Sequence, residues 1–356
     1  MNLMSLKDIP IESLETPTIL KKLATASRML AELKGVAASI PNQNILINTL
    51  GLQEAKDSSE IENIITTHDE IFKEESLTLG LSNVSAKEVL NYRQALKVGF
   101  DLVKKHQLLT MGTILQIHSH LELNLAGFRK QAGTTLKDSF GNIIYTPPQD
   151  PKEIETQMST LETLMNDDTS LMIDPLIKMA LIHHQFESIH PFYDGNGRTG
   201  RIINVLYLVK QGLLDNPLLY LSRHIVRTKS EYYRLLQEVR DKQVWEEWIL
   251  YILEAVESTA GETITTIQEI KKAFLDYKHQ IRANFKFYSQ DLINNLFSHP
   301  YTKIEFLEND LQVSRLTATK YLDALADGKF LKKEKIGRSN YYINVALYQI
   351  LTGTEK

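Results

Sequence analysis

The chain of 356 residues contains no cysteine. It can form no disulfide bond and can use no thiolate as a nucleophile, which is consistent with a reducing cytosol. No apolar run approaches the roughly 20 residues that cross a membrane. Met1–Pro10 lacks the basic stretch and apolar run of a signal peptide. We therefore expect a cytoplasmic protein that makes no membrane contact.

The chain also lacks a strong excess of charge, internal repeats and low-complexity segments. Its formal net charge is −4, so any contact with nucleic acid must come from a local basic patch. With 43% apolar and 24% charged residues, the composition is that of a globular protein. The length predicts two or three domains.

Apolar residues recur at helical spacing through most of the chain. The spacing predicts helices over 85–106, 110–124, 151–166, 174–187, 201–214, 228–240 and 244–277. A hinge is expected over Lys278–Phe287. We therefore expect a mainly α fold in three parts, which are an N-terminal helical region (1–84), a helical core (85–277) and a C-terminal domain (285–356).

A short β-type segment interrupts the helices after Gly127. Two apolar runs flank Asp138–Asn142, whose glycine and asparagine are typical of a hairpin turn. The strands of this hairpin are expected to comprise Thr134, Thr135, Leu136, Ile143, Ile144 and Tyr145.

The stretch from His190 to Arg201 reads His-Pro-Phe-Tyr-Asp-Gly-Asn-Gly-Arg-Thr-Gly-Arg and lies between two apolar helical stretches. A polar loop that opens onto a helix N-terminus binds phosphate well, because the first N–H groups are unsatisfied and the helix dipole favours negative charge. A neutral His190 could accept a proton. Asp194 suits Mg²⁺ that is shared with phosphate oxygens.

Gly195 and Gly197 allow the backbone to approach an anion closely, and Asn196 could orient a phosphate. Arg198 and Arg201 are permanent cations suited to a polyphosphate. We place Arg201 in the first turn of the second helix, where it opposes the dipole and favours an anionic partner. The plainer interpretation is a tight glycine turn with solvated arginines, which does not account for so many functional side chains in one loop. The loop is not a Walker-type P-loop, because the Lys-Ser/Thr pair is missing.

The twelve residues resemble the signature of the Fic family, His-Pro-Phe-x-Asp/Glu-Gly-Asn-Gly-Arg-x-x-Arg, at every position. The resemblance implies a Fic-type helical core with a β-hairpin flap, and transfer of AMP from ATP to a Ser, Thr or Tyr hydroxyl of a target protein and of the enzyme itself. It implies His190 as the base, Asp194 as the Mg²⁺ ligand, Arg198 on the β-phosphate and Arg201 on the γ-phosphate. The implied ATP-binding residues are Phe192, Tyr193, Asp194, Gly195, Asn196, Gly197, Arg198 and Arg201.

The same resemblance assigns two further elements around the loop. The hairpin would align a target segment by strand addition. Lys229, Tyr232 and Tyr233 resemble the adenine-side segment of the family, although core aromatic residues are an equal interpretation of the two tyrosines.

Ser58-x-x-x-Glu62-Asn63 resembles the inhibitory motif of the family, Ser/Thr-x-x-x-Glu-Gly/Asn. We expect this segment to open a helix that runs to about Phe72. Ser59-x-x-Glu62 also fits a capping box, which would keep Glu62 at its own helix terminus. Together with the loop signature, the inhibitory interpretation is favoured. Glu62 would then pair with Arg201 and take the place of the γ-phosphate.

The C-terminal part has the order helix, helix, helix and basic hairpin, which is typical of a winged helix-turn-helix. Residues 311–345 hold seven Lys or Arg and three Asp or Glu, a local net charge of +4. This domain could bind DNA through Lys332, Lys333, Lys335 and Arg338, or it could be a protein-interaction module. A homodimer is implied by the resemblance alone.

Three functions remain open at this point. The leading hypothesis is an autoinhibited, Mg²⁺-dependent protein adenylyltransferase. The second is a DNA-bound regulator whose Fic core senses nucleotide. The third is another reaction at the same site, such as transfer of a different nucleotide or removal of AMP with Glu62 positioning a water.

Overall fold

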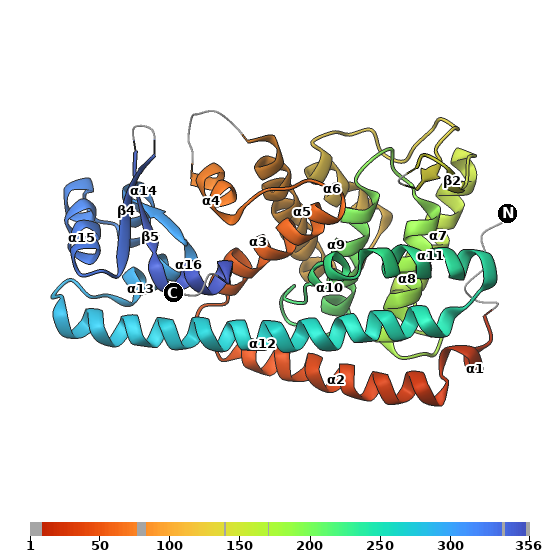
Figure 1. The fold of residues 1–356 in the computed structure, drawn as a ribbon, viewed down its shortest axis with the longest axis horizontal. Coiled ribbons are helices and arrows are strands. Elements are labelled where there is room, and N and C mark those ends of the chain that lie inside the picture. The colour runs from red at the N-terminus through yellow and green to blue at the C-terminus, as the bar shows by residue number, and fades with distance from the viewer. Residues whose placement is uncertain (1–8, 77–82, 139, 170, 337–338, 354–356) are drawn as a thin grey trace. The chain divides into compact units, whose positions relative to one another are not determined.

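The structure is a computed structural model that describes residues 9–76, 83–138, 140–169, 171–336 and 339–353. It is mainly helical, as expected. The elements, in chain order (Figure 1), are α1 (Ile11–Leu14), α2 (Pro17–Ala38), α3 (Gln43–Ile61), α4 (His68–Ser76), α5 (Val84–His106), α6 (Met111–Glu122), β1 (Leu136–Lys137), β2 (Ile143–Tyr145), α7 (Pro151–Asn166), α8 (Pro175–Ile189), α9 (Asn196–Lys210), α10 (Ser222–Arg227), α11 (Lys229–Lys242), α12 (Trp245–Asn284), α13 (Gln290–Ser298), β3 (Tyr301–Lys303), α14 (Ile304–Leu311), α15 (Arg315–Asp327), β4 (Leu331–Ile336), β5 (Ser339–Asn344) and α16 (Val345–Thr352).

The chain forms two compact units. Unit 1 comprises Met1–Lys34, Asp57–Ile64 and Asn91–Gly261, and unit 2 comprises Gly35–Lys56, Ile65–Leu90 and Glu262–Lys356. None of the described helices is long and apolar enough to cross a membrane.

Helices α8 and α9 form the centre of unit 1 and pack against each other (Figure 1). Helix α8 begins with Pro175, and the side chain of Asp174 caps it by accepting from the Leu176 N–H at 2.8 Å. Almost every residue of both helices is buried, as expected for helices that are surrounded by others. The two helices run antiparallel because only residues 190–195 connect them.

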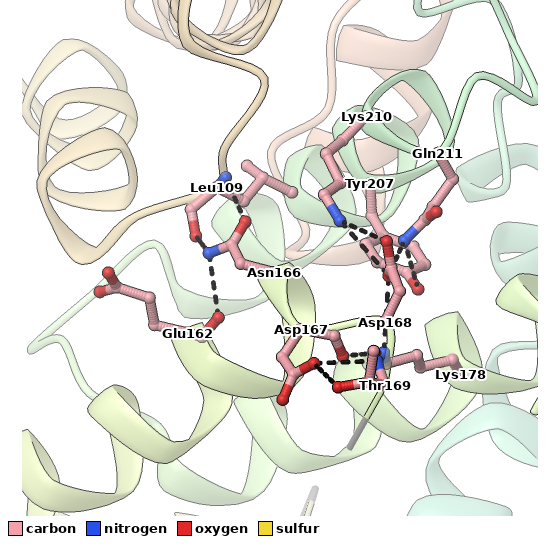
Figure 2. A network of polar contacts seen from close by, with 10 residues as sticks. All are labelled: Leu109, Glu162, Asn166, Asp167, Asp168, Thr169, Lys178, Tyr207, Lys210 and Gln211. Carbon is pink, nitrogen blue, oxygen red and sulfur yellow. Dashed lines mark hydrogen bonds and ion pairs between the residues drawn. The ribbon is translucent and has the colours of Figure 1, made fainter. Parts of the chain in front are cut away.

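The opposite ends of α8 and α9 are held by a polar network (Figure 2). Asp168, in the loop that precedes α8, accepts from Lys210 and from Gln211 at the end of α9. The Lys178 ammonium donates to the Asp167 carbonyl at 2.8 Å. This network fixes the far ends of the two helices and therefore the relative position of the ends that carry the loop.

Close packing of α5 against α6 and α9 depends on Gly99. A Cβ atom there would lie 2.8 Å from a side-chain carbon of Ile117, and Leu206 would crowd it further. We expect Gly99→Ala to lower the free energy of unfolding by about 1–3 kcal/mol, the usual cost of overpacking. Gly112→Ala is the matched control, since its Cβ meets only ordinary contact at 3.6 Å. Equal unfolding midpoints in urea for the two variants would contradict this packing argument.

Unit 2 contains a three-stranded antiparallel sheet of order β3-β5-β4. Helices α13, α14 and α15 accompany the sheet, and their buried residues include Phe297, Leu307 and Leu322. Ser314 caps α15 by accepting from the Thr317 N–H. Arg338 of the expected basic hairpin lies outside the described residues.

Several predicted boundaries are wrong. Helix α12 continues to Asn284, so most of the expected hinge over Lys278–Phe287 is helical. Helix α9 begins at Asn196, five residues before the predicted start. Strand β3 was not predicted, although its Thr302 and Lys303 pair with β5. Apolar periodicity alone does not locate such ends, because polar residues continue a helix as readily as apolar ones.

Candidate phosphate-binding site

The loop between α8 and α9 is shaped by two residues with positive φ. His190 terminates α8 in the left-handed region, with φ 48° and its N–H donating to the Phe186 carbonyl. Gly195 precedes α9 with φ 72°, a conformation that favours glycine. These two residues turn the chain from one buried helix into the next and leave the N-terminus of α9 facing the loop.

Buried contacts of Asn196 and His118 hold the loop in place. Both ends of the Asn196 amide bond to the Phe192 backbone, with Phe192 N–H donating at 2.8 Å and Phe192 carbonyl accepting at 2.9 Å. The His118 ring from α6 stacks on Phe192 at 3.7 Å between centroids, and its Nε2 lies 3.0 Å from the Asp194 carbonyl. Asn196 therefore shapes the loop in this structure, and its contact with a phosphate stays a prediction.

His190 has the electrostatic surroundings of a base. Burial, followed by the charges of Arg240 and Arg129, lowers its pKa to about 4. The imidazole is therefore neutral at pH 7 and can accept a proton.

Arg201 is almost completely buried and has an anionic partner. Its Nη2 lies 2.8 Å from Glu62 Oε1, and its side chain is 1% exposed. Its Nε donates to Ser58 Oγ at 2.8 Å, and its Nη2 also donates to the Ser58 carbonyl at 2.9 Å. Burial alone would lower the pKa of Arg201, but the Glu62 carboxylate reverses this and raises it. Arg201 is in the second turn of α9 rather than the first, which is occupied by Arg198.

The segment that holds Arg201 is the end of a helix, not its beginning. Helix α3 ends at Ile61, and Asn63 has φ 62°, the left-handed conformation that commonly terminates helices. The predicted helix from Ser58 to about Phe72 is therefore wrong, and so is the alternative capping box. We call Ser58–Asn63 the inhibitory segment, after its resemblance. The Lys229 ammonium donates to the Asn63 side chain at 3.1 Å.

Arg198 also has a carboxylate partner, which was not predicted from the sequence. Its Nη2 lies 2.8 Å from Oε1 of Glu122, the last residue of α6, and the two side chains are 4% and 15% exposed. Glu122 and His118 are four residues apart, so both lie on the face of α6 that contacts the loop.

Asp194 is the one carboxylate within the loop, and it is exposed. Its Oδ1 accepts the Gly195 N–H at 2.7 Å. Among the described residues, no group of three His, Cys, Asp or Glu could hold a metal. Mg²⁺ is commonly bound by one or two carboxylates together with phosphate oxygens and water, so Asp194 fits that ion when a nucleotide is present.

The expected adenine-side residues have different environments. Tyr232 is 1% exposed, and its hydroxyl lies 2.9 Å from His183 Nε2. Tyr233 is 42% exposed and packs its ring on Tyr232. Tyr232 thus has the contacts of a core aromatic residue, whereas Tyr233 has a surface available for a ligand.

The hairpin forms, but it is shorter than predicted. Leu136 pairs with Tyr145 and Lys137 with Ile143, whereas Thr134 and Thr135 precede the strand. Tyr145 anchors the hairpin to α8 through a hydrogen bond from its hydroxyl to the Ser188 carbonyl at 3.0 Å. The outer strand residues Ile143 and Ile144 are 61% and 40% exposed.

Two more buried ionisable side chains, Arg129 and Glu187, lie at the site and were not predicted. Arg129 is 1% exposed; its Nε donates to the His190 carbonyl at 2.8 Å, and its backbone N–H donates to the Pro191 carbonyl. Burial raises the pKa of Glu187 to about 7, and a Cβ atom at Gly200 would lie 2.8 Å from its carboxylate. Arg129 follows Gly127 in a stretch without periodicity, so nothing in the neighbouring sequence indicates that it contacts the loop.

These features define a class of protein, a helical domain with a candidate phosphate-binding loop at the N-terminus of a buried helix. The chain matches three family descriptions in succession, "Fic/DOC family N-terminal" over residues 20–101, "Fic/DOC family" over 108–208 and "Protein adenylyltransferase SoFic-like, C-terminal domain" over 275–347. The protein therefore belongs to the Fic/DOC family.

Curated relatives agree with this assignment. Protein adenylyltransferase fic-1 of Caenorhabditis elegans is 30% identical over 135 residues, which are 38% of this chain and 25% of the relative. A probable protein adenylyltransferase of Aquifex aeolicus is 28% identical over 202 residues, 55% of this chain and 57% of the relative. The similarity thus spans about a quarter to just over half of these relatives.

Solved structures share the fold. A Fic family protein from Desulfovibrio desulfuricans superposes with a TM-score of 0.59 at 18% identity, over 93% of this chain and 97% of that one. A C. elegans Fic-1 fragment superposes with a TM-score of 0.55 at 21% identity, over 71% of this chain and 74% of that one.

Proposed function

We propose that this protein is an autoinhibited protein adenylyltransferase that transfers AMP from ATP to a hydroxyl side chain of a protein, itself included. The names of the curated relatives support AMP transfer. The observation that carries the inhibition is the burial of Arg201 against Glu62 and Ser58. A γ-phosphate would need that same guanidinium.

The chemistry follows from the positions of the loop residues. His190 takes the proton of the target hydroxyl, whose oxygen attacks the α-phosphorus while pyrophosphate leaves. The N–H groups at the start of α9 stabilise the negative charge that develops on the phosphate. Asp194 would hold Mg²⁺, which would neutralise negative charge on the phosphates.

Inhibition is an exchange of partners. While Glu62 occupies Arg201, ATP lacks the contact that fixes its γ-phosphate, and its α-phosphate is not aligned for in-line attack. The Arg201 side chain is buried and the Glu62 side chain is 34% exposed, so salt screens this ion pair only in part. The hairpin residues Ile143 and Ile144 present an exposed edge that would align the target segment.

The test uses ATP labelled at the α- or the γ-phosphate. We expect Glu62→Gly to raise incorporation of the α-label into protein by roughly 10- to 100-fold, the usual range of an allosteric coupling. Glu60→Gly, in the final turn of α3 two residues before Glu62, controls for loosening of the helix by glycine. Autoradiography of the separated proteins gives the measurement.

Each other pattern of label selects another function. Equal α-label in wild type and Glu62→Gly would remove the inhibitory role. γ-label on protein would indicate a kinase-like reaction. Nucleotide binding without label in any variant would favour the nucleotide-sensing regulator.

The C-terminal part, residues 285–356, is proposed as a winged helix, supported by its helices and its β4–β5 hairpin. The proposal that this domain binds DNA has less support, because two of its basic residues already have acidic partners. Lys333 pairs with Asp323 at 2.6 Å, and Arg315 lies 3.6 Å from Glu305. If Lys332 and Lys335 contact phosphates, the full chain should lower the gel mobility of duplex DNA at low salt. Loss of that shift in Lys332→Ala/Lys335→Ala, measured by gel mobility, would support the contact, and no shift of the wild type would exclude it.

Homodimerisation is retained as a proposal from resemblance.

A further inference from the structure

Glu122 lies beside the N-terminus of α9, where the loop would bind phosphate. A Cβ atom added at Gly195 would collide with the Glu122 carboxylate, so this carboxylate stands directly against the loop backbone. It forms the ion pair with Arg198 at 2.8 Å. The carboxylate therefore occupies a position that is favourable for any anion.

The inhibitory segment repeats this arrangement one turn further along α9. A Cβ atom at Gly197 would collide with the Glu62 carboxylate, which pairs with Arg201. Gly195 and Gly197 thus each leave room for a carboxylate from another helix end, and Arg198 and Arg201 each already pair with one.

Glu122 gains little from its own helix. It is the last residue of α6, where the helix dipole disfavours a negative charge. The Arg198 guanidinium and the nearby start of α9 both favour its negative charge, and these are groups that a polyphosphate would use. A phosphate that reaches Arg198 therefore meets a like charge that is poorly screened, because both side chains are largely buried.

We propose that Glu122 is a second resident anion of the phosphate site, which competes with the nucleotide for Arg198 and weakens ATP binding. The inference rests on the proposed function, in which the β-phosphate contacts Arg198. Release of Glu62 alone would then free Arg201 but leave Arg198 paired with Glu122, and Glu122 would still limit the affinity for ATP.

The test compares Glu62→Gly with Glu62→Gly/Glu122→Gln. Glutamine keeps the size of the side chain and an oxygen that accepts from Arg198, and it removes the charge. We expect the KM for ATP in AMP transfer to fall by on the order of tenfold, the effect of one removed like charge, with kcat changed less than about twofold. Glu155→Gln, an exposed glutamate of α7, is the matched control.

The outcomes separate this inference from the proposed function. With unfolding midpoints equal to that of the parent, a higher KM would show that Glu122 supports nucleotide binding, and an unchanged KM would show that it does not compete with ATP. Either result would overturn the inference. Calorimetric titration with ATP adds a readout without catalysis. Tighter ATP binding by Glu122→Gln in the absence of AMP transfer by any variant would retain the inference and reject the adenylyltransferase. Loss of ATP binding in every variant would reject both.

Discussion

Replacement of His190 by alanine in the Glu62→Gly protein is expected to reduce AMP transfer by roughly 10²- to 10⁴-fold, the range of a general base. The side chain is poised for that role because burial lowers its pKa to about 4. The neutral form, which accepts a proton, therefore predominates at every pH well above 4. Initial rates with α-labelled ATP should be independent of His190 ionisation between about pH 6 and 8.

A matched histidine and a binding measurement separate this role from a structural one. His120→Ala, at a half-buried position on α6, should leave the rate unchanged. His190→Ala should still bind ATP, because the arginines and the α9 N-terminus are intact. A His190→Ala protein that transfers AMP at the parental rate would show that another group removes the proton.

The sequence predicted most of what lies inside the loop. His190, Asp194, the glycines and the arginines follow each other within twelve residues, so their proximity needs no tertiary information. The helices on both sides were predictable because their apolar residues are almost continuous. The contact between Glu62 and Arg201 was predicted from the resemblance alone, since 139 residues separate the two.

The remaining site residues come from elements whose packing the sequence does not specify. Glu122 and His118 belong to α6, which was predicted as an ordinary amphipathic helix, and nothing local indicates that its polar face meets the loop. The inhibitory segment was predicted to begin a helix but lies at the end of one, for a related reason. Ser59 and Glu62 satisfy a local capping pattern, but the apolar residues that precede them in α3 bury that helix up to Ile61, and Asn63 terminates it. Tertiary burial thus overrode a local signal.

Acidification is expected to unfold unit 1, because two histidines of α8 are buried in the neutral state. Burial lowers the pKa of His183 to about 3, with the charge of Arg201 adding to the effect, and burial lowers that of His184 to about 3. Within the described residues, Nδ1 of each ring is buried without a hydrogen-bond partner, so a proton there would have no acceptor.

The sign of the pH dependence follows from the pKa values. Both fall from an ordinary value of 6.5, so below pH 6.5 the unfolded chain binds more protons than the folded one. Above pH 6.5 the two histidines therefore cost the fold no stability. As the pH falls from 6.5 toward 3, each of them lowers the free energy of unfolding by about 1.4 kcal/mol per pH unit. Glu187 acts in the opposite direction. Its pKa is raised from 4.5 to about 7, so its protonation stabilises the fold as the pH falls and offsets one histidine between pH 6.5 and 4.5.

Single substitutions can isolate each of these titrations. His184→Gln keeps a donor for the Leu236 carbonyl, which accepts from Nε2 at 3.2 Å, and it should flatten the dependence by about 1.4 kcal/mol per pH unit. Glu187→Gln should steepen the dependence by the same amount, and the exposed His279→Gln should change nothing. Urea unfolding at pH 5, 6 and 7, followed by the fluorescence of Trp245 and Trp248, reports on unit 1, because both indoles pack on His184. Identical slopes in the wild type and His184→Gln would mean that the folded protein accommodates a charged ring at this position, and that burial of α8 does not limit stability in acid.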